Sequence, residues 1–154
     1  MEAIFLTGAF SVFEEDDTII LDHLPYKLKN GDWCGQGFTF YNGNITYSSE
    51  VKLKTACKGI IRLENFYGTP AEIYVNDEKV DTLFYSPAES RVLDLPEQFT
   101  LKIVITGSLR NSCGPFFCKT AQPVWCGPAQ FNDYSSPIRK LLPYGICGDV
   151  KIII

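Results

Sequence analysis

The sequence predicts an all-β protein in which two sheets pack face to face, as in a β-sandwich or jelly roll. Residues 45–53 and 99–106 alternate between apolar and polar side chains, which is the period-two pattern of a strand with one face in water. Other short β-rich segments follow one another between Gly, Pro and Asn turns, with almost no helical pattern and no internal repeat. Because each strand has an apolar face that must be covered, two packed layers are expected.

The N-terminal third is expected to hold extended segments around an acidic turn and a glycine-rich aromatic run. The ranges, in order, are a strand pair over 4–13 broken at Gly8, an acidic turn over 14–17, a strand over 18–21, a loop over 24–32, the aromatic run 33–41, a turn over 42–44 and a strand over 45–54. The acidic run could offer oxygen ligands to a structural calcium ion, but it lacks the regular spacing of a calcium loop. We interpret it as a solvated turn and assign no cofactor.

The rest of the chain is expected to add strands and then a long loop. The ranges are a strand over 59–64, a turn over 67–70, a hairpin with arms 71–75 and 79–85 and a tip at 76–78, a short strand over 91–95, a strand over 99–106, a loop over 107–134, one or two helical turns over 136–142 and a closing strand over 149–154. Long structureless loops inside a compact domain are usually functional or packed in their own right, and the loop over 107–134 is one of these.

Length and composition indicate one globular domain over residues 1–154. The net charge is −4 and the Lys and Arg residues are scattered, so no basic stripe is present for a nucleic-acid partner. No apolar run approaches the ~20 residues of a membrane-spanning helix, and the N-terminus lacks the pattern of a signal peptide. The chain is therefore cytoplasmic if it is complete. Its apolar first and last segments also suit a fragment of a longer protein, which is the interpretation we favour.

The six cysteines do not form a metal-binding pattern. They lie at positions 34, 57, 113, 118, 126 and 147, without a Cys-x-x-Cys pair and with a single histidine, His23. These spacings do not match a zinc finger or knuckle, so no metal site is expected. Free, partly buried thiols are the expected state, although sequence alone leaves disulfide pairing open.

Five short motifs, taken in order, suggest a family. They are FLTGAFSV at 5–12, QGFTFYNG at 36–43, AEIYVN at 71–76, TGSLRNSCGP at 106–115 and GPAQF at 127–131. Their order and spacing resemble the galactose-binding-domain-like jelly roll at the C-terminal end of many bacterial glycoside hydrolases, including rhamnosidase-like ones. The resemblance covers nearly the whole chain. It implies a non-catalytic module whose partner is the catalytic domain of a parent glycoside hydrolase. Sugar-binding members of that family often carry a structural calcium and exposed aromatic residues.

Aromatic residues in the glycine-rich run and in the long loop are candidates for a sugar platform, because an aromatic ring packs against the apolar face of a pyranose. The candidate aromatic residues are Trp33, Tyr41, Trp125 and Tyr134, and the candidate polar partners for sugar hydroxyl groups are Gln36, Asn42, Arg110 and Asn111. The alternative is that the aromatic residues close the end of the sandwich and that Arg110 and Asn111 hold the loop in shape.

No catalytic residue is assigned. Glycoside hydrolysis needs two carboxyl groups on either side of the scissile bond, and the acidic residues fall mostly on turns and polar strand faces. His23 with Ser108 or Ser112 lacks the Gly-x-Ser-x-Gly elbow of a hydrolase, and Cys113 and Cys118 have no neighbour in sequence that would activate a thiol. Three hypotheses remain: a non-catalytic accessory module, a genuine carbohydrate-binding module, and a self-standing enzyme.

Overall fold

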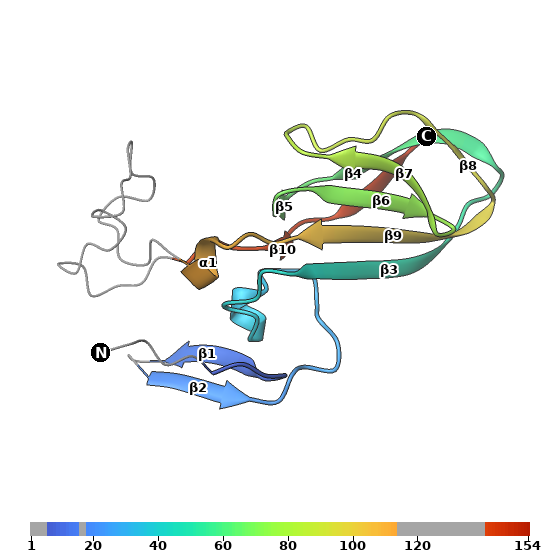
Figure 1. Cartoon of the computed structure of the whole chain (residues 1–154). Coiled ribbons are helices and arrows are strands. Elements are labelled where there is room, and N and C mark those ends of the chain that lie inside the picture. Colours follow the sequence, from blue (N-terminus) through green and yellow to red (C-terminus); the bar gives the residue numbers. More distant parts are fainter. Residues whose placement is uncertain (1–5, 16–17, 114–140) are drawn as a thin grey trace.

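The computed structural model describes residues 6–15, 18–113 and 141–154, and these residues form an all-β protein (Figure 1). The elements are β1 (Ser11–Glu15), β2 (Thr18–Asp22), the 3-10 turn η1 (Cys34–Gln36), β3 (Asn44–Lys52), β4 (Cys57–Leu63), β5 (Phe66–Tyr67), β6 (Ala71–Val75), β7 (Glu78–Leu83), β8 (Leu93–Leu95), β9 (Gln98–Thr106), the helical turn α1 (Arg110–Cys113), β10 (Gly145–Ile146) and β11 (Val150–Ile153). Within the described ranges no helix is long and apolar enough to cross a bilayer.

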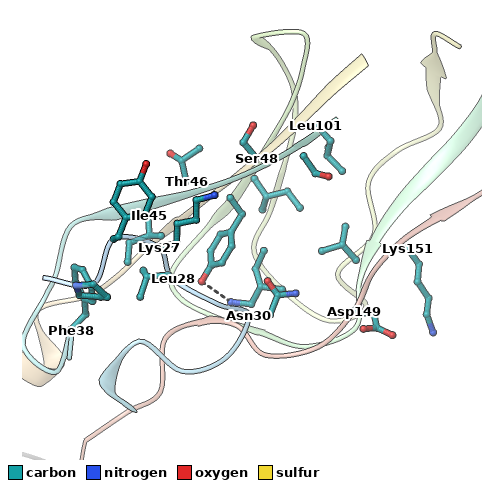
Figure 2. Close-up of a pocket in the computed structure, with 17 residues that line it drawn as sticks. Lys27, Leu28, Asn30, Phe38, Ile45, Thr46, Ser48, Leu101, Asp149 and Lys151 are labelled. Carbon is teal, nitrogen blue, oxygen red and sulfur yellow. Dashed lines mark hydrogen bonds between the residues drawn. The ribbon is translucent and has the colours of Figure 1, made fainter. Parts of the chain in front are cut away.

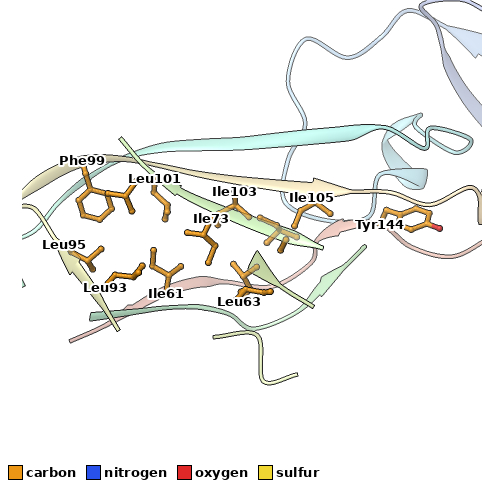
Figure 3. Packing of buried hydrophobic residues seen from close by; sticks show 14 of the residues in the cluster. Ile61, Leu63, Ile73, Leu93, Leu95, Phe99, Leu101, Ile103, Ile105 and Tyr144 are labelled. Carbon is orange, nitrogen blue, oxygen red and sulfur yellow. The ribbon is translucent and has the colours of Figure 1, made fainter. Parts of the chain in front are cut away.

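Two antiparallel sheets form the sandwich. One has the strand order β3-β9-β6-β7 and the other has the order β11-β4-β8. Figure 3 shows the side chains of Ile61 and Leu63 on one layer pointing toward Ile73 and the apolar side of β9 on the other. The predicted all-β fold is therefore confirmed, and the two facing sheets are consistent with a β-sandwich. Its apolar core lies between the sheets, as the alternating strands require.

The strand β9 carries the centre of this core, because it has a hydrogen-bonded neighbour on each side. The apolar residues of its predicted alternation are Phe99, Leu101, Ile103 and Ile105, which are all buried, and the residues between them are half-buried. In β3 the predicted apolar face is also correct, yet its residues are only half-buried. The reason is its place at the edge of the wider sheet, where the three-stranded layer covers it incompletely.

The hairpin predicted over residues 71–85 is formed by β6 and β7. Asn76 and Asp77 make its two-residue tip, with φ angles of 50° and 68°. Asn and Asp tolerate this left-handed conformation better than most residues, and turns of this kind suit the twist of a two-stranded ribbon. Glu78 was expected in the tip but belongs to β7.

The N-terminal strand pair lies elsewhere than the sequence suggested. Residues 6–10 are not in a strand, and β1 begins at Ser11 and pairs with β2 as a separate two-stranded sheet. Glu14 and Glu15, assigned to the acidic turn, are the last residues of β1, whereas positions 16–17 lie outside the described residues. The prediction of a break at Gly8 within a strand pair is therefore wrong, because the apolar residues around it pair with no described strand.

The C-terminal part was only partly predicted. The strand expected over 149–154 is present as β11, which pairs with β4. The short strands β5 and β10 pair with each other and were not predicted, since each contains only two residues. Of the long loop over 107–134, residues 107–113 are described and contain α1; the rest of it, and most of the helical turns expected over 136–142, lie outside the described residues.

Candidate functional site

Trp33, the first residue of the aromatic run, is buried in an aromatic cluster that consists of Trp33, Tyr41, Tyr47 and Tyr144. Its indole is 0% exposed, and its Nε1 donates a hydrogen bond of 2.8 Å to the hydroxyl of Tyr47. The rings of Tyr41 and Tyr144 lie 6.1 and 5.8 Å from the indole, centroid to centroid. A fully buried ring with its N–H satisfied inside the protein offers no face to a sugar, so Trp33 fills the end of the sandwich.

Backbone hydrogen bonds join this cluster to the C-terminal segment. Gly31 N–H donates to the carbonyl of Ile146 at 2.7 Å, and Trp33 N–H donates to the carbonyl of Tyr144 at 2.9 Å. Between these contacts Gly145 has φ = 112°, and a Cβ there would come within 2.5 Å of the Trp33 indole nitrogen. The segment therefore requires glycine at this position, for its conformation and for space.

The side-chain amide groups of Gln36 and Asn111 form hydrogen bonds within the protein. Gln36 Oε1 accepts from the Lys29 N–H at 2.8 Å, and its Nε2 donates to the carbonyls of Lys29 and Asp32. Asn111 is 0% exposed; its Nδ2 donates to the Leu142 carbonyl at 2.7 Å and its Oδ1 accepts from the Leu142 N–H at 2.8 Å. Each side chain bonds backbone N–H and C=O groups as a neighbouring backbone segment would. Gln36 thereby holds the loop at 29–32, and Asn111 holds the segment at Leu142.

The remaining predicted site residues are less buried than Trp33 and Asn111, or they lie outside the described ranges. Tyr41 is 38% exposed and donates from its hydroxyl to the Asn44 carbonyl at 3.0 Å. Arg110 is half-buried at the start of α1, next to the undescribed part of the loop. Trp125 and Tyr134 lie outside the described residues. The structure therefore brings together Trp33 and Tyr41, with Asn111 nearby through its bond to Cys34 Sγ at 3.3 Å.

Cys34 lies partly buried next to the aromatic cluster. Burial, followed by the charge of the neighbouring Asp32, raises the pKa of its thiol to about 12. A thiol with so high a pKa remains protonated at neutral pH and is a poor nucleophile. Cys34, Cys57, Cys113 and Cys147 are free, and all but the exposed Cys113 are partly buried as expected; the other two cysteines lie outside the described residues.

A groove of about 900 Å³ lies beside the aromatic cluster, along the edge strand β3 (Figure 2). Its walls come from the loop over 25–30, from β3 and from the start of β11, and its floor includes Leu101 and Ile103 of β9. Tyr47 links the groove to the cluster, because its hydroxyl also accepts from the Ile146 N–H at 3.4 Å. Sequence reasoning did not find this groove; the only signal was the apolar face of β3, which was expected to be core.

The groove combines an apolar floor with a polar rim. Lys27 and Asn30 contribute an amine and an amide group, while Thr46 and Ser48 contribute hydroxyl groups (Figure 2). The ring of Tyr26 is 95% exposed in the loop that forms one wall. Such a surface could hold a polar ligand or the edge of another domain.

The acidic groups of the described residues do not assemble into an acid–base pair in this groove. Asp149 is the one carboxylate among its described lining residues, whereas glycoside hydrolysis uses two. Outside the groove, hydrogen bonds from Lys151 and Lys79 lower the pKa values of Glu64, which follows β4, and of Glu72 in β6, respectively. A general acid needs the opposite shift. The described residues also contain no group of three or more His, Cys, Asp or Glu that could hold a metal ion.

Comparisons with known proteins identify a shared fold. No protein-family model and no curated protein matches the sequence. Among solved structures, a rhamnosidase from Novosphingobium sp. PP1Y is similar, with a TM-score of 0.50 and 20% sequence identity. The match covers 98% of this chain and 15% of that chain, so the protein described here spans a small part of the length of the rhamnosidase. A fold of this kind therefore occurs as one part of a glycoside hydrolase.

Proposed function

We propose that this protein is a non-catalytic accessory β-sandwich of a glycoside hydrolase, of the galactose-binding-domain-like kind, and that it packs on and stabilises a catalytic domain carried by the same polypeptide. The observation that carries the proposal is the coverage of the match: almost all of this chain corresponds to a small part of a rhamnosidase. Two further observations support it. The groove contains a single carboxylate among its described lining residues, and hydrogen bonds from lysines lower the pKa values of Glu64 and Glu72, which is opposite to the shift a general acid needs.

The test compares residues 1–154 with the complete product of the native open reading frame. We expect a longer product that hydrolyses aryl glycosides, such as 4-nitrophenyl rhamnoside, while residues 1–154 alone do not. We also expect the longer product to lose thermal stability when residues 1–154 are deleted. Glycosidase activity of residues 1–154 by themselves would overturn the proposal, and so would a native reading frame without a hydrolase domain.

The second candidate function is carbohydrate binding without catalysis. It is favoured by the exposed Tyr26 ring beside the polar rim of the groove. In this version Tyr41, Arg110, Trp125 and Tyr134 remain candidate contacts, whereas Trp33, Gln36 and Asn111 keep their structural hydrogen bonds. Affinities would be weak, with a Kd of roughly 10 μM to 1 mM.

Titration calorimetry with a panel of plant and microbial glycans decides between the two functions. Tyr26→Ala should weaken binding if the groove is the site, and Trp125→Ala should do so if the long loop is the site. Tyr85→Ala is the matched control, because Tyr85 is 78% exposed and does not line the groove. If no glycan in the panel binds, the carbohydrate-binding function is excluded.

A further inference from the structure

The hairpin of β1 and β2 exposes apolar side chains that a folded protein normally covers. All five residues of β2 are exposed, including Ile19 at 50%, Ile20 at 38% and Leu21 at 47%. Because neighbouring side chains of a strand point to opposite sides, these three residues make both faces of β2 apolar. Strands that are apolar on both faces are typical of positions buried on both faces.

The hairpin is held to the sandwich through β1, which leaves β2 on the outer side. The Val12 N–H donates to the Gly37 carbonyl at 2.8 Å, and the Thr39 hydroxyl donates to the Val12 carbonyl at 2.7 Å. Among the described strands β2 has a single partner, β1, so its other edge is unpaired within the described ranges. Figure 1 shows this hairpin to one side of the two packed sheets.

Water is an unfavourable environment for such a hairpin. An isolated two-stranded hairpin is marginally stable, and an open apolar edge invites pairing with another chain. Natural edge strands usually carry Lys or Pro, yet β2 carries two isoleucines and a leucine in sequence. The described acidic residues of the hairpin are Glu14, opposite Ile19, with Glu15 opposite Thr18 and Asp22 at the end of β2.

We propose that β2 is the docking surface for the adjoining domain of the parent hydrolase. The inference rests on the proposed function, because the partner is the remainder of the same polypeptide, which makes up most of the matched rhamnosidase chain. The chemistry defines the partner's surface: an apolar patch that covers Ile19 and Leu21, flanked by Lys or Arg side chains facing Glu15 and Asp22. A strand of the partner would also pair with the backbone edge of β2 that no described strand occupies.

Hydrogen–deuterium exchange on the complete parent protein tests the inference. The alternate N–H groups of β2 that point away from β1 should exchange at least ten times more slowly in the parent than in residues 1–154 alone. Ile19→Lys in the parent should restore fast exchange. Phe84→Lys, at a residue that is 64% exposed after β7, should leave the protection of β2 unchanged.

Two further measurements keep the outcomes distinguishable. The urea midpoint of residues 1–154 should be the same with and without Ile19→Lys, which shows that the variant folds. If the parent has a hydrolase domain but β2 exchanges equally fast in both proteins, the docking surface is wrong and the accessory function stands. If residues 1–154 form a dimer by sedimentation that protects β2 equally well, a second copy is the partner and the inference is overturned. A parent without a hydrolase domain overturns the proposed function itself.

Discussion

Replacing Asn111 by Asp changes one atom of the buried amide from a donor to an acceptor. In the native protein Asn111 Nδ2 lies 2.7 Å from the Leu142 carbonyl oxygen and 3.3 Å from Cys34 Sγ. A carboxylate oxygen at this position would face the carbonyl oxygen and repel it. A buried group left without its partner costs about 1–3 kcal/mol, and an unpaired buried charge costs about 3–5 kcal/mol. We expect Asn111→Asp to lower the free energy of unfolding at pH 7 by roughly 3 kcal/mol or more.

The loss should shrink in acid. The protonated form of the introduced carboxyl group can donate to the Leu142 carbonyl, so the folded state favours the neutral form and raises the pKa of that group above its unfolded value of about 3.9. A raised carboxyl pKa means that stability is recovered as the pH falls through the folded-state pKa toward about 4, with a limiting slope of about 1.4 kcal/mol per pH unit. As the pH rises, that stability is lost.

Urea unfolding at pH 7 and at about pH 4.5, close to the unfolded-state pKa, measures both effects as differences from the wild type when it is followed by tryptophan fluorescence. Asn42→Asp is the matched control, since Asn42 is exposed and its Nδ2 makes one bond of 3.3 Å to Ser112 Oγ. The control should change the free energy of unfolding by less than about 0.5 kcal/mol. The reasoning is refuted if the two variants are equally stable at pH 7, because the hydrogen bonds of Asn111 would then contribute no more to stability than those of a surface amide.

Three other predictions follow from the same structure. Gly145→Ala should destabilise the fold by about 2 kcal/mol or more in urea unfolding, because its φ is positive and a Cβ would collide with the buried indole; wild-type stability would contradict this. Cys34, with a pKa of about 12, should be alkylated at about pH 8 well after the exposed Cys113, as peptide mass spectrometry can show. Lys79 lowers the pKa of Glu72, so this pair stabilises the fold above about pH 4.3 and loses its effect as the pH falls through the folded-state pKa. Because the pair lies at the surface, Glu72→Gln should lower the melting temperature by only roughly 1–3 °C at pH 7 and not at all at about pH 2.

Local patterns predicted the elements whose structure depends on neighbours in sequence. The alternation of apolar and polar residues over 99–106 identified β9 and its buried face. In a strand of this kind the apolar positions are the ones that face the core. Turn chemistry, which acts within about four residues, predicted the hairpin tip over 76–78, of which the structure keeps Asn76 and Asp77. Both features depend on a short segment alone, so they can be predicted without knowing the rest of the chain.

Contacts between distant segments were not predictable in the same way. Trp33 pairs through its backbone with Tyr144, and Asn111 pairs with Leu142; nothing in the local pattern around these residues indicates their partners. For this reason a glycan role and a structural role were both open for Trp33 and Asn111 at the level of sequence. Burial and completed hydrogen bonds, which appear only in the fold, favour the structural role for both.

The strand β2 shows a further limit of hydrophobic patterning. Ile103 in β9 and Ile20 in β2 are both apolar, and an apolar residue in a strand predicts a buried position. The residue type does not predict which segment buries it. In β9 the cover is the opposing sheet of this chain, and Ile103 is 3% exposed. In β2 no described segment supplies the cover, and Ile20 is 38% exposed. The apolar pattern of β2 therefore raises the question of what covers it; under the proposed function, that cover is the adjoining domain of the parent hydrolase.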